Sequence, residues 1–257
     1  MLLTPERVPF GFRVWRRNWT VFKKFAMAEV GPLFVEPLVV LGAMGIGLGA
    51  YVSLSGDESY VQFIGPGIVG GYSLFAAFFE CTYGSYTRMA IRGLYEAMIA
   101  TPLSIEDVIT GEVLWGATRS VFSATVILFV LTVMGFVDSP LAILIPPLAF
   151  LGGILFSSMA LLVTAHAPSF WTFNYAITLG VMPMYFFGGV FFPLERYPDV
   201  VRELAWIIPL TPYVAVIREL VAGSLSMTTV WGLLYLVVLG AAFYYLAVAR
   251  MKARLIR

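Results

Sequence analysis

The longest uncharged stretch of this chain runs from Ser139 to Leu194, 56 residues without Asp, Glu, Lys or Arg. A helix crosses a hydrocarbon core of about 30 Å with about 20 apolar residues, because each residue adds about 1.5 Å. The stretch is therefore too long for one crossing. The sequence His166-Ala167-Pro168-Ser169 offers a turn inside it, so we predict two membrane spans here, at 140–164 and 170–191.

The rest of the chain is also strongly apolar: 60% of its 257 residues are hydrophobic, 12% are charged, and the mean hydropathy is +0.89. Such a composition is far from that of a soluble domain. Lipid cannot satisfy unpaired backbone groups, which excludes an open sheet and leaves helices as the spanning elements. We predict an all-α integral membrane protein, a single domain over residues 1–257, with six transmembrane helices at 30–53, 60–84, 111–135, 140–164, 170–191 and 227–249.

Basic residues gather at both ends of the chain, outside the predicted spans. They are Arg7, Arg13, Arg16, Arg17, Lys23 and Lys24 before the first span and Arg250, Lys252, Arg254 and Arg257 after the last. Because loops and termini rich in Lys and Arg stay in the cytoplasm, both termini are predicted to be cytoplasmic. No cleavable signal peptide is recognisable, so the first helices are expected to direct insertion.

The N-terminal segment, about 4–28, carries an apolar stripe with helical spacing. The stripe consists of Val8, Phe12, Trp15, Trp19, Phe22 and Ala26. Most of the basic residues lie off it, which predicts an amphipathic helix in the membrane surface with its basic side toward anionic headgroups. The alternative is a solvated basic arm that only sets topology.

The region of about 85–104, between the second and third predicted spans, is expected to be a folded cytoplasmic loop. Three charged residues there recur every four positions and share one face of a predicted short helix: Arg88, Arg92 and Glu96. Thr101-Pro102 ends that helix, because proline disfavours helical geometry in the residue before it. Ser104 and Asp107 have the spacing of a capping box at the start of the next helix. A solvated connector is the alternative.

The stretch of about 192–224 interrupts the last apolar segments with prolines and charges. Helices are predicted over about 198–208 and 212–222, each about 15 Å long and thus half a bilayer. We predict a re-entrant helical hairpin that forms an outer gate, with a static plug as the alternative. The residues assigned to this gate are Pro193, Pro198, Asp199, Glu203, Pro209, Pro212 and Arg218.

Arg119 falls inside a predicted span, where an ionisable group is costly and needs a partner. We expect it to pair with Glu80, or failing that with Glu36, and so to lock neighbouring helices. Direct contact with cargo or proton coupling are the alternatives for this residue. Four aromatic residues could line the path of an amphipathic lipid or could equally form lipid-facing surface: Phe186, Phe187, Phe191 and Phe192.

Three separated stretches resemble one family. The segment GVFFPLERYPDVVRELAWIIPLTPYVAVIREL is similar to the C-terminal signature of the ABC type-2 exporter permeases. FFECTYGSYTRM, YEAMIATPLSIEDVITGEVLWG and FNYAITLGVMPMYFFGGVFFPL resemble, more narrowly, the lipo-oligosaccharide exporter permeases of nodulation (NodJ) type. The resemblance covers nearly the whole chain after the basic N-terminal segment.

The resemblance implies a subunit that forms a homodimer in the bacterial cytoplasmic (inner) membrane, with a cytoplasmic helix touching an ATPase and outer helices capping a lipid-accessible pathway. The residues then expected to couple to the ATPase are Arg88, Arg92, Glu96, Thr101 and Pro102. The implied cargo is an amphipathic lipid-linked or glycolipid molecule, resembling a lipo-oligosaccharide or polysaccharide. Efflux of drugs or small hydrophobic molecules by the same family is the alternative.

The sequence contains no G-x-x-x-x-G-K-[ST] motif, so a primary pump would need its motor on another chain. We expect this chain to be a transport subunit and not an enzyme, with two separate P-loop ABC ATPase subunits that hold ATP and Mg²⁺. No cofactor or metal site is expected in the chain, whose one histidine is His166, and no nucleic-acid partner is expected. An integral-membrane enzyme acting on lipid-linked sugar, or a secondary transporter, would be the other functional classes.

Overall fold

The computed structural model describes residues 10–49, 51 and 59–256, and every regular element in that part of the chain is helical. The longer α-helices are α1 (Phe10–Val40), α2 (Tyr60–Phe79), α4 (Ile105–Val133), α5 (Ile145–His166), α9 (Leu210–Ala222) and α10 (Met227–Leu255). The short ones are α3 (Leu94–Ile99), α6 (Trp171–Ala176), α7 (Met182–Phe187) and α8 (Asp199–Ala205). The π-helical segments are η2 (Leu41–Leu48), η3 (Glu80–Gly84), η4 (Thr87–Ile91) and η6 (Ile177–Val181), and the 3₁₀ turns are η5 (Pro140–Leu144) and η7 (Leu194–Arg196).

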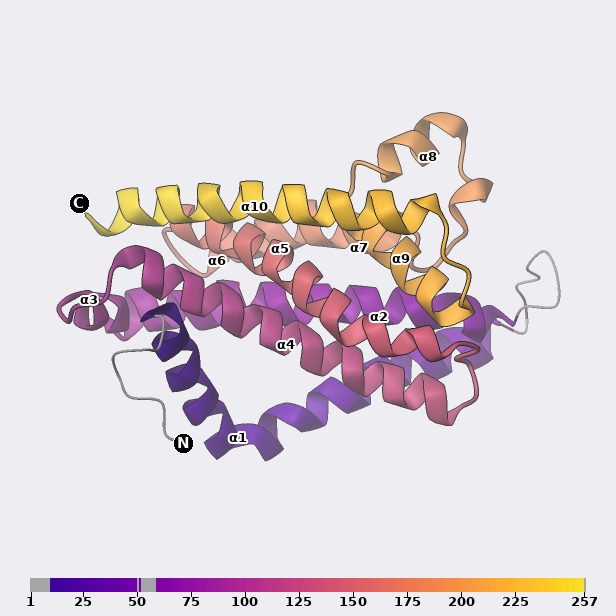
Figure 1. The fold of residues 1–257 in the computed structure, drawn as a ribbon, viewed down its shortest axis with the longest axis horizontal. Coiled ribbons are helices and arrows are strands. Elements are labelled where there is room, and N and C mark those ends of the chain that lie inside the picture. Colours follow the sequence, from indigo (N-terminus) through magenta and orange to yellow (C-terminus); the bar gives the residue numbers. More distant parts are fainter. Residues whose placement is uncertain (1–9, 50, 52–58, 257) are drawn as a thin grey trace.

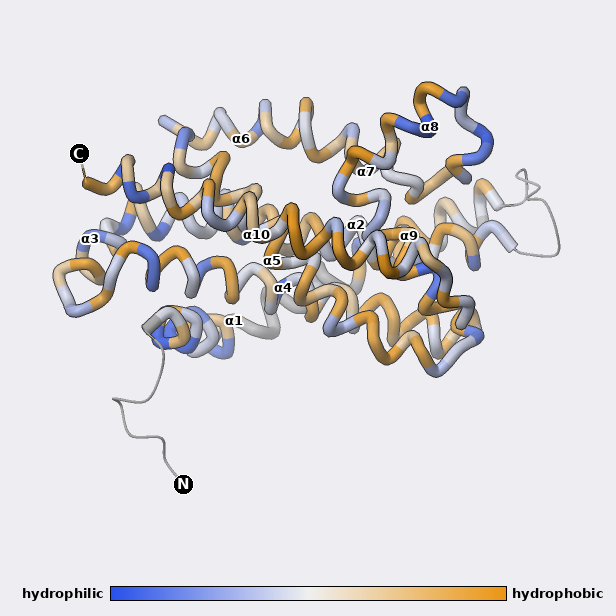
Figure 2. The backbone as a smooth tube through the Cα atoms, turned by 45° about the horizontal axis from the view of Figure 1, so that its top comes forward, coloured by the Kyte–Doolittle hydropathy of each residue, from blue (hydrophilic) through white to orange (hydrophobic). Residues whose placement is uncertain are grey.

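Four helices, α2, α4, α5 and α10, run lengthwise beside one another and form the body of the molecule (Figure 1). Helix α5 lies at the centre, packed against α2, α4 and α10. Small residues permit the close approach of α5 to α4. A Cβ added to Gly153 of α5 would lie only 2.6 Å from the Cα of Ala117 in α4, so a larger residue would not fit there without a shift. Hydrophobic residues dominate the middle of the bundle, whereas hydrophilic residues are more frequent toward its ends, for example on and beside α8 (Figure 2).

The described residues contain four helices that are long and apolar enough to cross a membrane: Tyr60–Ile91, Ile105–Val133, Pro140–His166 and Met227–Leu255. These coincide with four of the six predicted spans. The bent pair of α8 and α9 would make a fifth if it were one span. The six-span prediction is therefore confirmed only in part.

The two remaining predicted spans have different outcomes. The span at 30–53 falls on the end of α1 and on η2, and its last residues lie outside the described part of the chain. The span at 170–191 contains one helical run, Trp171 to Phe187, built from α6, η6 and α7. Its 17 residues reach about 26 Å, which is short of the hydrocarbon thickness.

Helix ends follow the chemistry of their capping residues. Ser104 and Asp107 form the predicted capping box at the start of α4, with reciprocal side-chain and backbone hydrogen bonds. Ser59 and Gln62 form another at the start of α2. Gly223 ends α9 with φ +75°, a left-handed conformation that glycine adopts without steric cost.

Three residues of the apolar stripe predicted for the N-terminal segment pack on protein, namely Trp15, Trp19 and Phe22, whereas Phe12 is 42% exposed. Val8 and the side chain of Ala26 lie outside the described part of the chain. The Trp15 indole donates a hydrogen bond of 2.8 Å to Thr118, and the ring of Trp19 stacks on that of Phe122 at 5.7 Å. Phe22 meets Trp115 edge to face. The start of α1 thus packs on α4 through aromatic contacts, and α1 bends before it continues along the bundle (Figure 1). An interfacial position for this helix is not confirmed, and residues 4–9 lie outside the described part.

Gly67 of α2 lies directly beneath the segment that follows α7. A methyl group at this position would stand 2.6 Å from the Val190 carbonyl oxygen and 2.8 Å from the Val190 Cα. Because backbone cannot yield as a side-chain tip can, we expect Gly67→Ala to cost about 1–3 kcal/mol of stability. The measurement is the midpoint temperature of unfolding of the purified protein in detergent.

Gly47→Ala is the matched control, because nothing lies within 4 Å of a Cβ added there. Its effect should stay within about 0.5 kcal/mol, as is usual for surface substitutions. Equal midpoints for the two variants would contradict the close contact between α2 and Val190.

Candidate functional site: a lateral groove and its charge network

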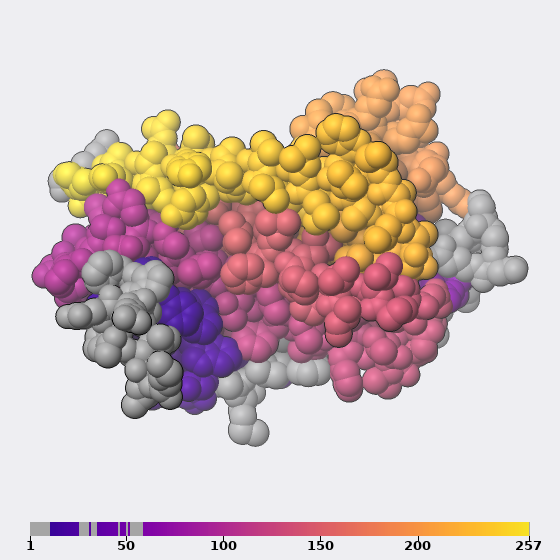
Figure 3. Space-filling view, viewed as in Figure 1, coloured from indigo at the N-terminus to yellow at the C-terminus, as the bar shows by residue number. Residues whose placement is uncertain are grey.

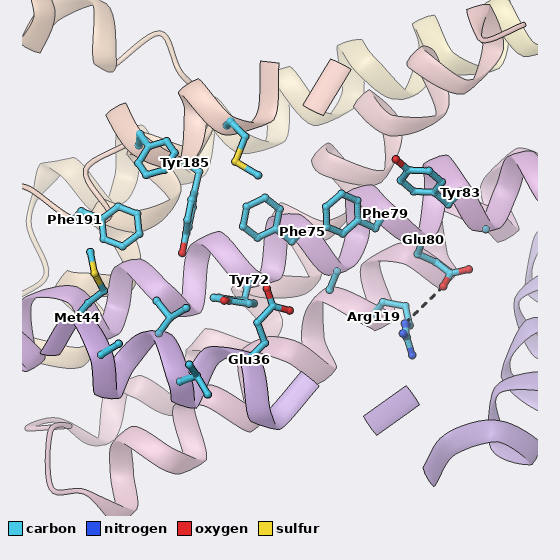
Figure 4. Close-up of a pocket in the computed structure, with 17 residues that line it drawn as sticks. Glu36, Met44, Tyr72, Phe75, Phe79, Glu80, Tyr83, Arg119, Tyr185 and Phe191 are labelled. Atoms are coloured by element: carbon cyan, nitrogen blue, oxygen red, sulfur yellow. Dashed lines mark ion pairs between the residues drawn. The ribbon is translucent and has the colours of Figure 1, made fainter. Parts of the chain in front are cut away.

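A groove of about 970 Å³ lies in the side of the bundle, lined by α1, η2, α2 and α7 (Figure 4). Its wall is mostly apolar and aromatic. Four aromatic residues of α2 and its extension recur every three or four positions and so share one face: Tyr72, Phe75, Phe79 and Tyr83. We call these four the aromatic row.

The rings of the aromatic row form a nearly continuous surface. The Phe75 and Phe79 centroids are 5.6 Å apart with an interplanar angle of 8°, and Tyr83 follows 6.1 Å from Phe79. From the opposite wall, Tyr185 of α7 meets Phe75 at 4.8 Å. This arrangement provides an extended apolar surface that a flat or chain-like molecule can follow.

Charged side chains lie at one end of the groove and continue into the protein. Glu80 and Arg119 line the groove itself, with Arg119 Nε 3.7 Å from Glu80 Oε2 (Figure 4). The other Glu80 oxygen accepts a hydrogen bond of 2.9 Å from Arg88. Arg88 in turn pairs with Glu112 at 2.5 Å. We call Glu80, Arg88, Glu112 and Arg119 the charge network.

Glu112 is the most deeply placed member of the charge network, with a fully buried side chain. Arg88 donates hydrogen bonds to both Glu112 carboxylate oxygens. Its Nε lies 3.0 Å from Oε1 and 3.1 Å from Oε2, and its Nη2 also donates to Oε2. Ser85 donates to Oε2 at 2.6 Å, and Asn18 of α1 donates to Oε1 at 3.1 Å. A buried carboxylate is tolerated only when paired and hydrogen-bonded in this way. The network therefore joins α1, α4 and the extension of α2.

The π-helical segments after α2 shape this site. An α-helix bonds residues four apart, whereas a π-helix bonds residues five apart and widens the turn. Segments η3 and η4 flank Ser85 and include Glu80 and Arg88, all of which contact one another or Glu112. Irregular helix of this kind is often found at functional sites.

The structure changes the interpretation of Arg88. We predicted that it shares an exposed helix face with Arg92 and Glu96 for contact with an ATPase. Instead its side chain, only 15% exposed, turns inward to Glu80 and Glu112. The single helix face does not exist either, because Gly93 adopts φ +59° and separates η4 from α3. Burying the Glu112 carboxylate requires a cation, and Arg88 supplies it.

The other predicted coupling residues lie at the surface. Arg92, Glu96, Thr101 and Pro102 are exposed at the end of the bundle that carries α3. Between them Tyr95 is fully buried and anchors α3 against the protein. Sequence reasoning missed the pairing of Arg88 with Glu112, although a signal was present: Glu112 is an acid at the start of a predicted span, where an acid needs a partner.

The outer helices form an elbow. Helices α8 and α9 meet at 85°, so their arrangement is close to a right angle and the predicted hairpin is not confirmed. Pro198 precedes α8, as predicted, whereas α9 begins at Leu210 after Pro209 and not at the predicted start at Pro212. Helix α9 is largely buried in the bundle. Helix α8 projects from the surface, and its Asp199 and Glu203 are exposed (Figure 3).

The base of the elbow is held by hydrogen bonds to backbone carbonyls. Arg218 of α9 donates to the Gly189 carbonyl at 2.6 Å, and its guanidinium lies 4.0 Å from the centre of the Phe63 ring. Tyr60 donates to the Phe191 carbonyl at 3.1 Å. Of the four aromatics predicted along a cargo path, Phe186 and Phe191 line the groove. Phe187 and Phe192 lie outside its lining, and Phe187 contacts Tyr197.

Four helices long and apolar enough to cross a membrane, with a largely apolar groove beside them, are the features of an integral membrane protein. The family model of the ABC-2 type transporter matches residues 12–222, and the chain belongs to that family.

Known proteins of similar sequence agree with this assignment. The chain is 32% identical over 244 residues to Nodulation protein J of Rhizobium leguminosarum bv. trifolii, covering 95% of this chain and 93% of that protein. Nodulation protein J of Rhizobium meliloti (strain 1021) is 33% identical over 211 residues, 82% of this chain and 80% of its own length. The Inner membrane transport permease YadH of Escherichia coli (strain K12) is 22% identical over 233 residues, 90% of each chain.

The pair of Arg88 and Glu112 can be tested by a double-mutant cycle. Glu112→Leu leaves the Arg88 guanidinium with Glu80 as its one remaining acid among the contacts described, so we expect a loss of about 3 kcal/mol, seen as a lower unfolding midpoint. Adding Arg88→Met removes the guanidinium charge and should restore part of that loss.

Glu106→Leu serves as the control, since Glu106 is an acid of the same helix with a half-exposed partner, Lys252, at 2.7 Å. Its cost should stay below about 1 kcal/mol. If the losses of Arg88→Met and Glu112→Leu simply add in the double variant, the two side chains do not stabilise the fold as a pair.

Proposed function

We propose that this chain is the permease subunit of an ATP-driven exporter that moves an amphipathic lipid-linked or glycolipid molecule outward across the bacterial cytoplasmic membrane. The observation that carries the proposal is the groove, because one wall combines an aromatic row for apolar groups with charges at one end. The family membership and the names of the relatives support transport. The relatives named Nodulation protein J support a lipo-oligosaccharide-like cargo over a drug.

The motor would be a separate protein. Two P-loop ABC ATPase subunits would bind ATP and Mg²⁺ and join two copies of this chain, which itself has no phosphate-binding loop motif. The start of α1, α3 and the end of α10 gather at one end of the bundle (Figure 1). Basic residues at that end, among them Arg92 and Arg250, favour a cytoplasmic location under the positive-inside rule.

Motion of the ATPase would reach the groove through the charge network. The exposed surface of α3 with Glu96, together with Arg92 just before this helix, is the contact that we assign to the ATPase. A displacement of α3 acts on Tyr95, whose buried side chain lies in the electrostatic field of Glu112 and Arg88. Arg88 also holds Glu80, which lines the groove. The network thus connects the contact surface with the wall along which cargo would move.

The outer elbow would act as a gate in which only α8 moves. Its base is fixed by the bonds of Arg218 and Tyr60 to the chain after α7. Helix α8 buries little of its surface: of its seven residues only Ala205 is fully buried. An element with few buried contacts moves away from the bundle at a low cost in free energy, and α8 is such an element. Helix α9 is largely buried, so its movement would cost more.

The decisive experiment is reconstitution. Purified from its native membrane, the chain should retain a P-loop ATPase, and proteoliposomes with both should move a fluorescent glycolipid across the bilayer when supplied with ATP and Mg²⁺. Drug-like cations moved in preference to the glycolipid would favour the efflux alternative. Absence of any associated ATPase would contradict the proposal.

Coupling is tested at the exposed surface of α3. Arg92→Ala combined with Glu96→Ala removes both charges without touching a buried contact, so the protein should insert and fold normally. We expect transport and cargo-stimulated ATP hydrolysis to fall about tenfold in the reconstituted complex, the effect of losing about 1.4 kcal/mol of interaction.

The control for this prediction is Asp138→Asn, an exposed acid in the connection between α4 and η5. It should leave both rates unchanged. A complex of the double α3 variant that assembles and hydrolyses ATP at the normal coupled rate would remove α3 from the coupling path.

The gate is tested by tethering α8. In a background of Cys81→Ala, Asp199→Cys or Glu203→Cys is cross-linked to the same position of a second copy. Export should stop while the ATPase still binds nucleotide, because α8 can no longer move away from the pathway. Normal export through fully cross-linked protein would identify the elbow as a static plug.

A further inference from the structure

A carboxylate lies inside the groove, away from the charge network at its end. Glu36 of α1 is exposed to the groove, and in Figure 4 the side chains of Glu36, Tyr72 and Tyr185 converge on one stretch of it. The Glu36 carboxylate lies beside Tyr72, and the Tyr185 hydroxyl points toward both (Figure 4). Three helices thus each bring one oxygen-bearing group to the same place. An ionisable group within a membrane is costly, which makes it a candidate for function.

The chemistry of these three groups is selective. An ionised carboxylate only accepts hydrogen bonds, whereas a phenol both donates and accepts. Immediately beside them, Phe75 and Phe79 present stacked, nearly parallel rings. A sugar ring matches both parts, because its hydroxyls radiate from the rim and its C–H groups form an apolar face. The carboxylate can receive two hydroxyls at once, while the phenols can donate to a ring oxygen or an amide carbonyl.

We propose that Glu36, Tyr72 and Tyr185 form a binding subsite for a neutral sugar head group, whose apolar face lies against Phe75 and Phe79. The subsite deepens the proposed function, on which it rests, by naming the head group of the cargo. The negative charge of Glu36 disfavours head groups that carry phosphate, sulfate or carboxylate. The groove follows α2 and its extension from Tyr72 to Gly84, about 18 Å, which leaves room for further sugar rings beside the first.

An organic cation is the competing ligand for a carboxylate near aromatic rings. Cation sites turn the faces of their rings toward the ammonium group. Here Tyr185 directs its hydroxyl end toward Tyr72 and Glu36 (Figure 4), so that the groups around the carboxylate are hydrogen-bonding oxygens. The arrangement therefore favours a ligand with several hydroxyls over a ligand with one positive charge.

The test compares three probes with the same dodecyl chain and different head groups. They are dodecyl maltoside, dodecyltrimethylammonium and dodecyl phosphate. Binding is measured on the full-length protein in lipid nanodiscs, with empty nanodiscs as the blank. We expect the maltoside to bind tightest and Glu36→Gln to weaken its binding about tenfold or more, as for loss of a charge-assisted hydrogen bond. Tyr72→Phe, which deletes one hydroxyl, should weaken it severalfold.

Asp138→Asn is the matched control, because it also removes one carboxylate charge but at a residue that does not line the groove. This variant should bind all three probes as the native protein does. Equal maltoside affinity in the native protein and in both Glu36→Gln and Tyr72→Phe would overturn the subsite. Tighter binding of dodecyltrimethylammonium, lost in Glu36→Gln, would overturn it in favour of a cation site. Because no ATPase is present, failure here is distinguishable from failure of ATP-driven export.

Discussion

The fully buried Glu112 carboxylate and its partner Arg88 are the interaction on which the α3 end of the bundle depends. A carboxylate without water is stable only if a cation and hydrogen-bond donors replace its hydration shell. Arg88 contributes the edge of its guanidinium formed by Nε and Nη2, and Ser85 and Asn18 donate further hydrogen bonds to the two oxygens. Three helical elements that are distant in the sequence are therefore required to meet at one point.

That requirement also explains how the groove and the surface of α3 can communicate. Arg88 satisfies Glu112 and still binds Glu80, while Glu80 faces Arg119 across the end of the groove. A rearrangement at α3 cannot leave Glu112 alone in the protein, because an unpaired buried charge is much more costly than a shifted pair. Movement is therefore expected to transfer along the charge network to the groove wall.

The opposite end of the bundle is stabilised by side-chain donors to backbone carbonyl groups. There the chain after α7 is fixed by donors to its carbonyl oxygens, from Arg218 to Gly189 and from Tyr60 to Phe191. Gly67 lets α2 approach the same segment closely. The result is a rigid base from which α8 projects with little burial. Stability is thus unevenly distributed between the rigid base and α8, as expected if α8 moves more readily than α9.

The sequence by itself determined the membrane character, the helical class, the positions of four spans and the helix boundaries set by Ser104, Pro198 and Gly223. These depend on local quantities, namely the length of apolar runs and the conformational limits of single residues. It also suggested the contact of Arg119 with Glu80. Only the tertiary structure decided that Arg88 turns inward, that α8 and α9 meet at 85°, and that Glu36 lines the same groove as Tyr72 and Tyr185. Spacing along a helix states which residues share a face, but it does not state which neighbouring helix that face meets. The partner is chosen by the free energy of burying each charge among the helices that pack around it.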